Sequence, residues 1–171
     1  MHLYFLRHGK AEEHTTGKAD SSRHLIERGF ADAGLVASLL KSAAIAFDAI
    51  YSSPYPRASE TALVVAQRLQ AEGVYSERME LEAGRFGIGS LQMLTRNHKA
   101  NAHLLFVGHE PDISQTIQLL CGAECEMKTA GLAYISLDRV EPQRGILHWL
   151  LTPKLLQQEI TQENHSPASN E

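Results

Sequence analysis

The sequence predicts an α/β protein, a three-layer αβα sandwich whose central sheet is mostly parallel and closes with a C-terminal antiparallel hairpin. Short apolar runs alternate with longer amphipathic segments through most of the chain, which is the pattern of consecutive βα units. Two further apolar runs then follow each other directly, joined by a polar loop that contains Pro142. Two strands joined by so short a loop pair in antiparallel fashion. Together these observations place helices on both faces of one sheet.

The elements follow from the period of the apolar residues. Runs of apolar residues predict strands, and apolar residues recurring on one helical face predict helices. We expect strands near 2–7, 47–52, 77–81, 103–108, 131–138 and 145–151, and helices near 27–42, 56–71, 90–99 and 111–121. The chain has 171 residues, 43% of them hydrophobic, which is enough to bury one good core. We therefore expect residues 1–156 to form a single domain. The polar residues 157–171 are expected to form a fraying helix end and a disordered tail.

Composition excludes several classes of function. The net charge of −4 leaves no basic stripe to neutralise phosphates, so we expect no nucleic-acid partner. No apolar run approaches membrane-spanning length, and Arg7 and His8 interrupt the start too early for a secretory signal. We therefore expect a cytoplasmic protein with no membrane partner. Cys121 and Cys125 are too few for a zinc site and should stay reduced and partly buried.

The first strand carries the most informative residues. It delivers Arg7 and His8 at its carboxyl end, followed by Gly9. Neither a guanidinium nor an imidazole can lie in hydrocarbon without a partner, and open α/β sheets bind their ligands at this edge. Arg presents a planar fork for phosphate oxygens, and His can act as a nucleophile or carry a proton. By themselves, the three residues could equally mark a strand end that meets solvent.

Two later segments repeat the arrangement. The strand ending at Ser52 leads into a helix with Arg57 in its first turn, where Pro54 favours the first helical position and Ser53 is placed as the cap. The strand 103–108 ends at His109, and a helix again follows. Because the carboxyl ends of parallel strands share one edge, we expect Arg7, His8, Arg57 and His109 to converge. Two fixed cations and two imidazoles predict a phosphate site.

These motifs resemble the histidine phosphatase superfamily (phosphoglycerate mutase-like). The resemblance covers roughly residues 1–152 and rests on the Leu-Arg-His-Gly start, the Ser-Ser-Pro-x-x-Arg-Ala-x-Glu-Thr block and Gly-His-Glu-Pro. Length and motif spacing are similar to the SixA-type phosphohistidine phosphatases. The resemblance implies that His8 takes the phosphoryl group while Arg7, Arg57 and His109 clamp it. Members of the family also tend to carry an Arg a few residues ahead of a Leu-Thr-x-x-Gly helix start, so the resemblance implies that Arg23 is a phosphate-binding residue. Ile26 replaces the Thr of this motif and cannot cap a helix.

The resemblance implies a two-step mechanism that needs no metal or other cofactor, since the two Arg residues supply the charge. His8 attacks phosphorus and water hydrolyses the phosphohistidine intermediate, while main-chain N–H groups around Gly9 and Glu110 are candidate phosphate donors. In larger members of the family that the chain resembles, the general acid is a Glu or Asp in the region after the second motif. Here the candidates are Glu80 and Glu82, which alternation places on one face at the end of the third strand, where both could instead be solvated.

An imidazole leaves more readily than an alcohol, so a site with a weak acid favours phosphohistidine on a protein, such as a phosphotransfer domain, as the substrate. Two alternatives stay open. The chain could be a phosphatase for small phosphate esters within the same superfamily. It could also be a non-catalytic module that binds phosphorylated histidine on a partner.

Overall fold

A computed structural model describes the backbone of residues 1–163 and the side chains of residues 1–158. Its centre is a six-stranded sheet in the order β3-β2-β4-β1-β5-β6. The strands are β1 (His2–Arg7), β2 (Ala49–Ser52), β3 (Tyr75–Glu77), β4 (His103–Gly108), β5 (Leu132–Ser136) and β6 (Ile146–Leu151). β1 to β4 run parallel, whereas β5 pairs antiparallel with β1, and β6 antiparallel with β5. The predicted mixed sheet with its C-terminal hairpin is confirmed.

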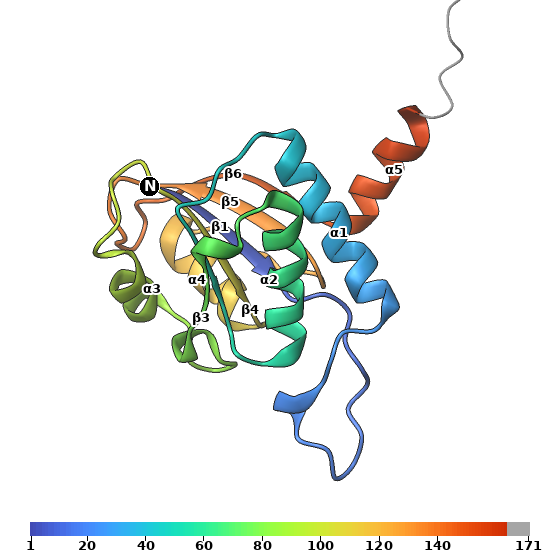
Figure 1. The fold of residues 1–171 in the computed structure, drawn as a ribbon. Helices are drawn as coiled ribbons and strands as arrows, with labels where there is room; N and C mark the ends of the chain where they lie inside the picture. Colours follow the sequence, from blue (N-terminus) through green and yellow to red (C-terminus); the bar gives the residue numbers. More distant parts are fainter. Residues whose placement is uncertain (164–171) are drawn as a thin grey trace, which may run out of the picture.

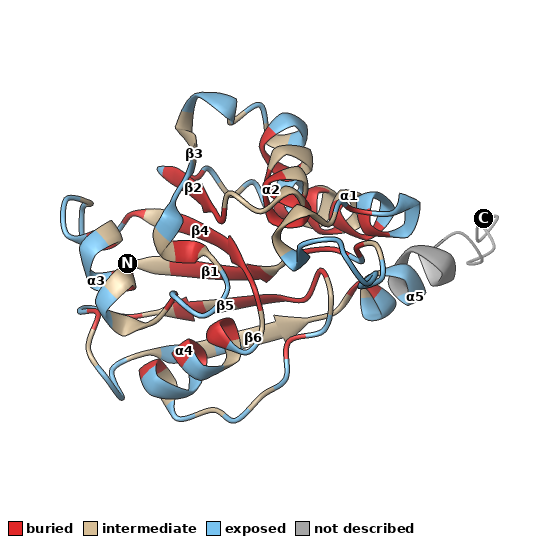
Figure 2. Cartoon of the chain, turned by 90° about the horizontal axis from the view of Figure 1, so that it is seen from below, coloured by how far each residue is buried: buried red, intermediate tan, exposed pale blue. Residues whose placement is uncertain are grey.

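Helices cover both faces of the sheet (Figure 1). They are α1 (Glu27–Ser42), α2 (Pro56–Leu69), α3 (Ile88–Thr95), α4 (Asp112–Cys121) and α5 (Pro153–Glu163), with short 3-10 helices η1 (Asp20–Ser22), η2 (Glu72–Val74) and η3 (Met79–Leu81). One apolar cluster joins α1 and α2 to the sheet through residues such as Leu40 and Val65. The other joins α3 and α4 through Leu91 and Ile117. The predicted three layers are therefore confirmed, and Figure 2 shows the buried residues concentrated in the strands and on the inner sides of the helices.

The strand predicted at 77–81 is wrong. β3 ends at Glu77, and Met79–Leu81 forms the 3-10 helix η3. β3 lies at the edge of the sheet, and its partner β2 pairs with it only as far as Ser52, opposite Glu77. The Arg78 N–H makes the last contact with β2, at the Ser52 carbonyl oxygen, and beyond it the chain leaves the sheet. Leu81 is still fully buried, because it packs into the α3–α4 core instead of extending the sheet.

The C-terminal segment differs in part from the expectation. α5 occupies Pro153–Glu163 and packs against α1, where the sequence predicts only a fraying helix end. The disordered tail expected up to residue 171 lies largely outside the described residues.

Cys121 and Cys125 are both half-buried and free of disulfide. Within the described part of the chain, no helix is long and apolar enough to span a membrane.

Parallel pairing brings three strand ends to one edge. β1 is flanked by β4, and β4 by β2, with Arg7 opposite Gly108 and Ser52 opposite Val107. The residues that follow these strands, namely His8, Ser53 and His109, therefore lie side by side. Because β5 runs antiparallel to β1, the segment before β5 reaches the same edge, where the Ala130 N–H donates to the His8 carbonyl oxygen at 3.1 Å.

Candidate active site

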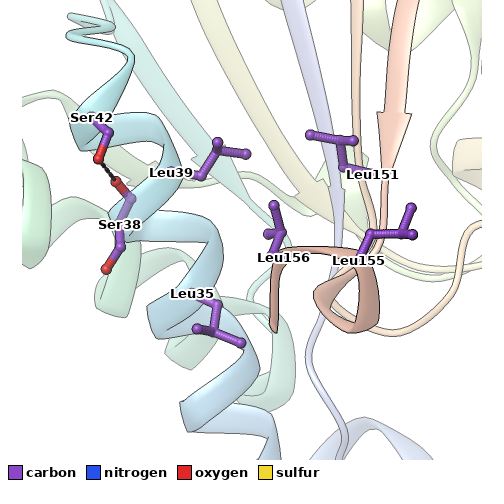
Figure 3. A pocket seen from close by; sticks show the side chains of 7 residues that line it. All are labelled: Leu35, Ser38, Leu39, Ser42, Leu151, Leu155 and Leu156. Atoms are coloured by element: carbon purple, nitrogen blue, oxygen red, sulfur yellow. Dashed lines mark hydrogen bonds between the residues drawn. The ribbon is translucent and has the colours of Figure 1, made fainter. Parts of the chain in front are cut away.

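Two hollows in the surface differ in chemistry. The first, of about 510 Å³, lies between α1, the end of β6 and α5, where leucines of the three elements face one another (Figure 3). It is lined by Leu35, Ser38, Leu39, Ser42, Leu151, Leu155 and Leu156. Both serine hydroxyls donate to main-chain carbonyl oxygens of their own helix. A hollow lined by leucines and paired hydroxyls offers no group for acid, base or nucleophilic chemistry.

The second hollow, of about 270 Å³, lies at the carboxyl edge of the parallel strands. We call it the edge pocket. It is lined by Arg7, His8, Lys10, Ala11, Asp20, Arg23, Arg57, Ala83, His109, Glu110 and Thr129. The structure thus brings together the four residues expected to converge, together with Arg23 and Glu110. Cations outnumber anions in this lining, which suits an anionic ligand.

His8 is held as a neutral imidazole with one nitrogen free of hydrogen. Its Nδ1 lies 2.8 Å from the Gly9 carbonyl oxygen, and a carbonyl can only accept, so Nδ1 carries the proton and Nε2 a lone pair. Burial lowers the pKa of His8 to about 4, the Gly9 hydrogen bond opposes this, and the charges of Arg57 and Arg7 add to the lowering. Burial is a larger cause than the arginine charges. At neutral pH this is the protonation state of a nucleophile.

Arg57 lies next to His8. It is 3% exposed in the first turn of α2, and its Nε donates to His8 Nε2 at 3.2 Å. Its Nη2 donates to the Asp20 carboxylate at 2.8 Å, and its Nη1 to the Asp20 main-chain oxygen. The guanidinium also packs 5.3 Å from the centre of the Tyr55 ring. A buried Arg whose donors rest on a histidine and on a loop carboxylate has the charge and the planar fork to bind an anion.

Asp20 is a site residue that the sequence did not indicate. It begins η1 within the loop that leaves β1, and its carboxylate pairs with both Arg57 and Arg23. Burial alone would raise the pKa of Asp20, but the charges and hydrogen bonds of the two arginines outweigh it and lower the pKa. The carboxylate is therefore ionised at neutral pH. No local signal distinguishes Asp20 from Glu12 and Glu13 in the same polar loop.

His109 follows β4 and is 2% exposed. Its Nε2 lies 2.8 Å from Ser53 Oγ, and its ring is 5.2 Å from that of His8 and 5.1 Å from that of Tyr55. Burial lowers the pKa of His109 to about 3, and His8 and Arg57 contribute to the lowering. Ser53 does not cap α2 as predicted, because the helix begins later, at Pro56. Its hydroxyl accepts the Tyr55 N–H and contacts His109 instead.

Arg7 is oriented by the segment before β5. Its Nη1 donates to the Met127 carbonyl oxygen at 2.7 Å, while its Nε is buried without a hydrogen-bond partner in the described part of the chain. Met127 is fully buried and so gives this acceptor a fixed position. Because Met127 is 120 residues away in sequence, no motif around Arg7 could have indicated it.

Other expected site residues lie elsewhere or are already occupied. The Gly9 N–H donates to Thr61 Oγ1 at 3.0 Å, so it is not available to phosphate. Glycine is needed there for packing, since a Cβ on Gly9 would lie 2.6 Å from the Gly29 carbonyl oxygen at the start of α1. Glu80 and Glu82 do not line the edge pocket, because η3 replaces the strand that would have aimed them. Glu82 pairs with Arg85 at 3.2 Å.

Glu110 and Arg23 do reach the pocket, each tied to its own loop. The Glu110 carboxylate accepts from the Ser114 N–H at 3.2 Å and from Ser114 Oγ at 2.6 Å, which fixes the first turn of α4. Arg23 donates through Nη1 to the Glu12 carbonyl oxygen at 2.7 Å and through Nε to Asp20 at 2.8 Å. Both side chains are therefore engaged by protein groups.

Known proteins match this chain along most of its length. Residues 3–87 match the model of the histidine phosphatase superfamily (branch 1). An uncharacterised protein of Picosynechococcus is 33% identical over 77% of this chain and 82% of its own. The phosphohistidine phosphatase SixA of Escherichia coli is 26% identical over 90% of this chain and 94% of its own.

Solved structures agree with the sequence matches. A structure of the protein histidine phosphatase SixA complexed with tungstate superposes with a TM-score of 0.79 at 26% identity, covering 91% of this chain and 99% of the other. Sequence and architecture thus point the same way as the pocket of paired arginines and histidines at the sheet edge. The chain belongs to the histidine phosphatase superfamily and is of the SixA type within it.

Proposed function

We propose that this protein is a phosphatase that works through a phosphohistidine intermediate on His8 and removes phosphate from phosphohistidine on a partner protein. The observation that carries the proposal is the state of His8. It is buried beside two arginines, and its Nδ1 proton is held by the Gly9 carbonyl oxygen. Its Nε2 lone pair is thereby directed into the edge pocket as a nucleophile.

The resting contacts of Arg57 indicate where the phosphoryl oxygens bind. Its donors rest on His8 Nε2 and on Asp20, a nitrogen and a carboxylate that a phosphoryl group can replace. Arg-phosphate pairs are strong because the guanidinium fork matches the oxygens. When Arg57 turns to the phosphoryl group, it also releases the His8 lone pair for attack. The relative solved with bound tungstate, a tetrahedral oxyanion, supports this reading.

The reaction then proceeds in two balanced steps. His8 Nε2 forms a bond to phosphorus while the bond from phosphorus to the substrate imidazole nitrogen breaks, and the departing imidazole takes a proton from solvent. Water next attacks the phosphorus of phospho-His8, the P–N bond breaks, and inorganic phosphate leaves. Arg7, Arg57 and His109 stabilise the equatorial oxygens, where charge accumulates in both transition states.

The acids of the pocket favour a nitrogen leaving group over an alcohol. An alkoxide needs a proton from a general acid. Asp20 is kept ionised by its arginine neighbours, and the Glu110 carboxylate is engaged by Ser114. Phosphohistidine needs no acid of the pocket, because its second ring nitrogen can take a proton from solvent, and the P–N bond then releases a neutral imidazole, whose conjugate acid has a pKa of about 6.5. The pocket is thus suited to the P–N bond of a phosphoprotein.

The test compares phosphate release from a histidine-phosphorylated phosphotransfer domain with release from alkyl phosphates. We expect rapid release from the phosphoprotein, slow release from the esters, and a transient label on the enzyme that is stable in alkali but labile in acid. The matched control is His8→Asn, because an Asn amide can keep the hydrogen bond to Gly9. Faster turnover of the esters would favour the small-ester alternative, and stable binding without release would favour a binding module.

A further inference from the structure

The two ring nitrogens of His109 have very different surroundings. Nε2 lies 2.8 Å from Ser53 Oγ, whereas Nδ1 is buried and has no hydrogen-bond partner in the described part of the chain. Buried polar atoms are nearly always paired, and an exception calls for an explanation. The two nitrogens point to different sides of the ring, so Nδ1 faces away from Ser53 in a residue that lines the edge pocket.

The Ser53 hydroxyl decides which nitrogen carries the proton. A hydroxyl has one hydrogen to donate and two lone pairs with which to accept. Ser53 Oγ already accepts the Tyr55 N–H at 3.2 Å, and its other contact among the described residues is His109. If Ser53 donates to Nε2, one polar group stays unpaired, the N–H at Nδ1. If Nε2 donates to Ser53, two groups stay unpaired, the Nδ1 lone pair and the serine hydrogen.

The arrangement with a single unpaired donor also suits an anion. A phosphoryl oxygen accepts hydrogen bonds, so it is attracted to an Nδ1–H and repelled by an Nδ1 lone pair. The Tyr55 and His8 rings pack on His109 and hold its plane. Asp20 and His109 line the same pocket, so an anion that replaces the Asp20 carboxylate on Arg57 enters the pocket that His109 lines.

We propose that Ser53 is a positioning residue: its hydroxyl donates to His109 Nε2, fixes the Nδ1–H tautomer, and so prepares His109 as a donor to the transferring phosphoryl group. The inference rests on the proposed function and deepens it. Serine therefore serves the chemistry at a position where the sequence alone indicates a helix cap. A donor aimed at transition-state charge typically contributes on the order of a hundredfold in rate.

The test substitutes Ser53 by Ala and by Thr, with Ser52→Ala as the matched control. Ser52 is the same residue type, equally buried and adjacent, but its hydroxyl donates to the Ser53 carbonyl oxygen and does not contact His109. The first readout is the tautomer of His109, from the ¹⁵N shifts and proton couplings of its ring nitrogens. We expect Nδ1–H in the wild type, S53T and S52A, and a shift towards Nε2–H in S53A.

Kinetics and anion binding give the second readout. S53A should lower kcat on the phosphoprotein by about tenfold to a hundredfold with little change in KM, and should weaken tungstate binding, while S53T restores both. A wild type with Nε2–H overturns the inference, whether or not S53A folds. A folded S53A variant that keeps Nδ1–H overturns it as well, whatever its activity. If the wild type does not cleave phosphohistidine, the proposed function fails, yet the tautomer and tungstate measurements still decide the role of Ser53.

Discussion

Acidification should destabilise the native protein through His8. The pKa of His8 is 6.5 in an unfolded chain and about 4 in the folded protein. Between pH 4 and pH 6.5 the unfolded chain binds a proton on His8 that the native state does not bind. The contribution of His8 to the free energy of unfolding is therefore complete above pH 6.5 and falls as the pH drops towards 4. The physical cause is that the imidazole is 8% exposed and lies beside Arg57 and Arg7.

The size of the effect follows from the two pKa values. Each pKa unit corresponds to about 1.4 kcal/mol, so full protonation of His8 costs the native state about 3 kcal/mol. At pH 5 about 2 kcal/mol of this is already lost relative to pH 8. Such a loss is a large share of the stability of an ordinary domain. The same titration places the acid limb of kcat/KM near pH 4.

The assay is urea unfolding at pH 8, 6.5 and 5 for the wild type, His8→Asn and His14→Gln. The Asn amide can keep the donor to the Gly9 carbonyl oxygen but does not titrate, so His8→Asn should lose about 2 kcal/mol less than the wild type between pH 8 and pH 5. His14 is exposed in the loop after β1, and its variant should follow the wild type. Parallel losses in the wild type and His8→Asn, at equal m-values, would refute the reasoning.

Three further predictions concern activity. His8→Ala should abolish phosphatase turnover while circular dichroism reports an intact fold, and retention of more than a few per cent of turnover would contradict the assignment. Asp20→Asn should lower KM for the phosphoprotein severalfold, because the phosphoryl group no longer competes with a carboxylate for Arg57; an increase in KM would assign Asp20 to substrate binding instead. Glu80→Gln combined with Glu82→Gln should leave the rates on phosphoprotein and alkyl phosphate within about twofold of wild type, since neither residue lines the edge pocket; selective slowing of the ester would reinstate one of them as the acid.

Much of the architecture was determined by the sequence because its causes are local. The strands at residues 2–7 and 103–108 and the helix at 27–42 lie where the apolar period predicts them. Parallel pairing then forces the strand ends together, so the meeting of Arg7, His8, Arg57 and His109 could be predicted without coordinates. The third strand was predicted at 77–81 but lies at Tyr75–Glu77, because alternation in the sequence cannot show where the neighbouring strand ends.

Only the tertiary structure decided how these side chains are held. Asp20 on Arg57, Met127 on Arg7 and Ser53 on His109 each join residues separated by 37 to 120 positions. Hydrogen-bond partners across a sheet edge are fixed by the packing of whole elements, which no local pattern records. Residue types and strand order thus specify that arginines and histidines meet at this edge. The hydrogen-bond donors, tautomers and protonation states of the edge pocket depend on which groups, distant in sequence, are brought by packing to within about 3 Å of one another.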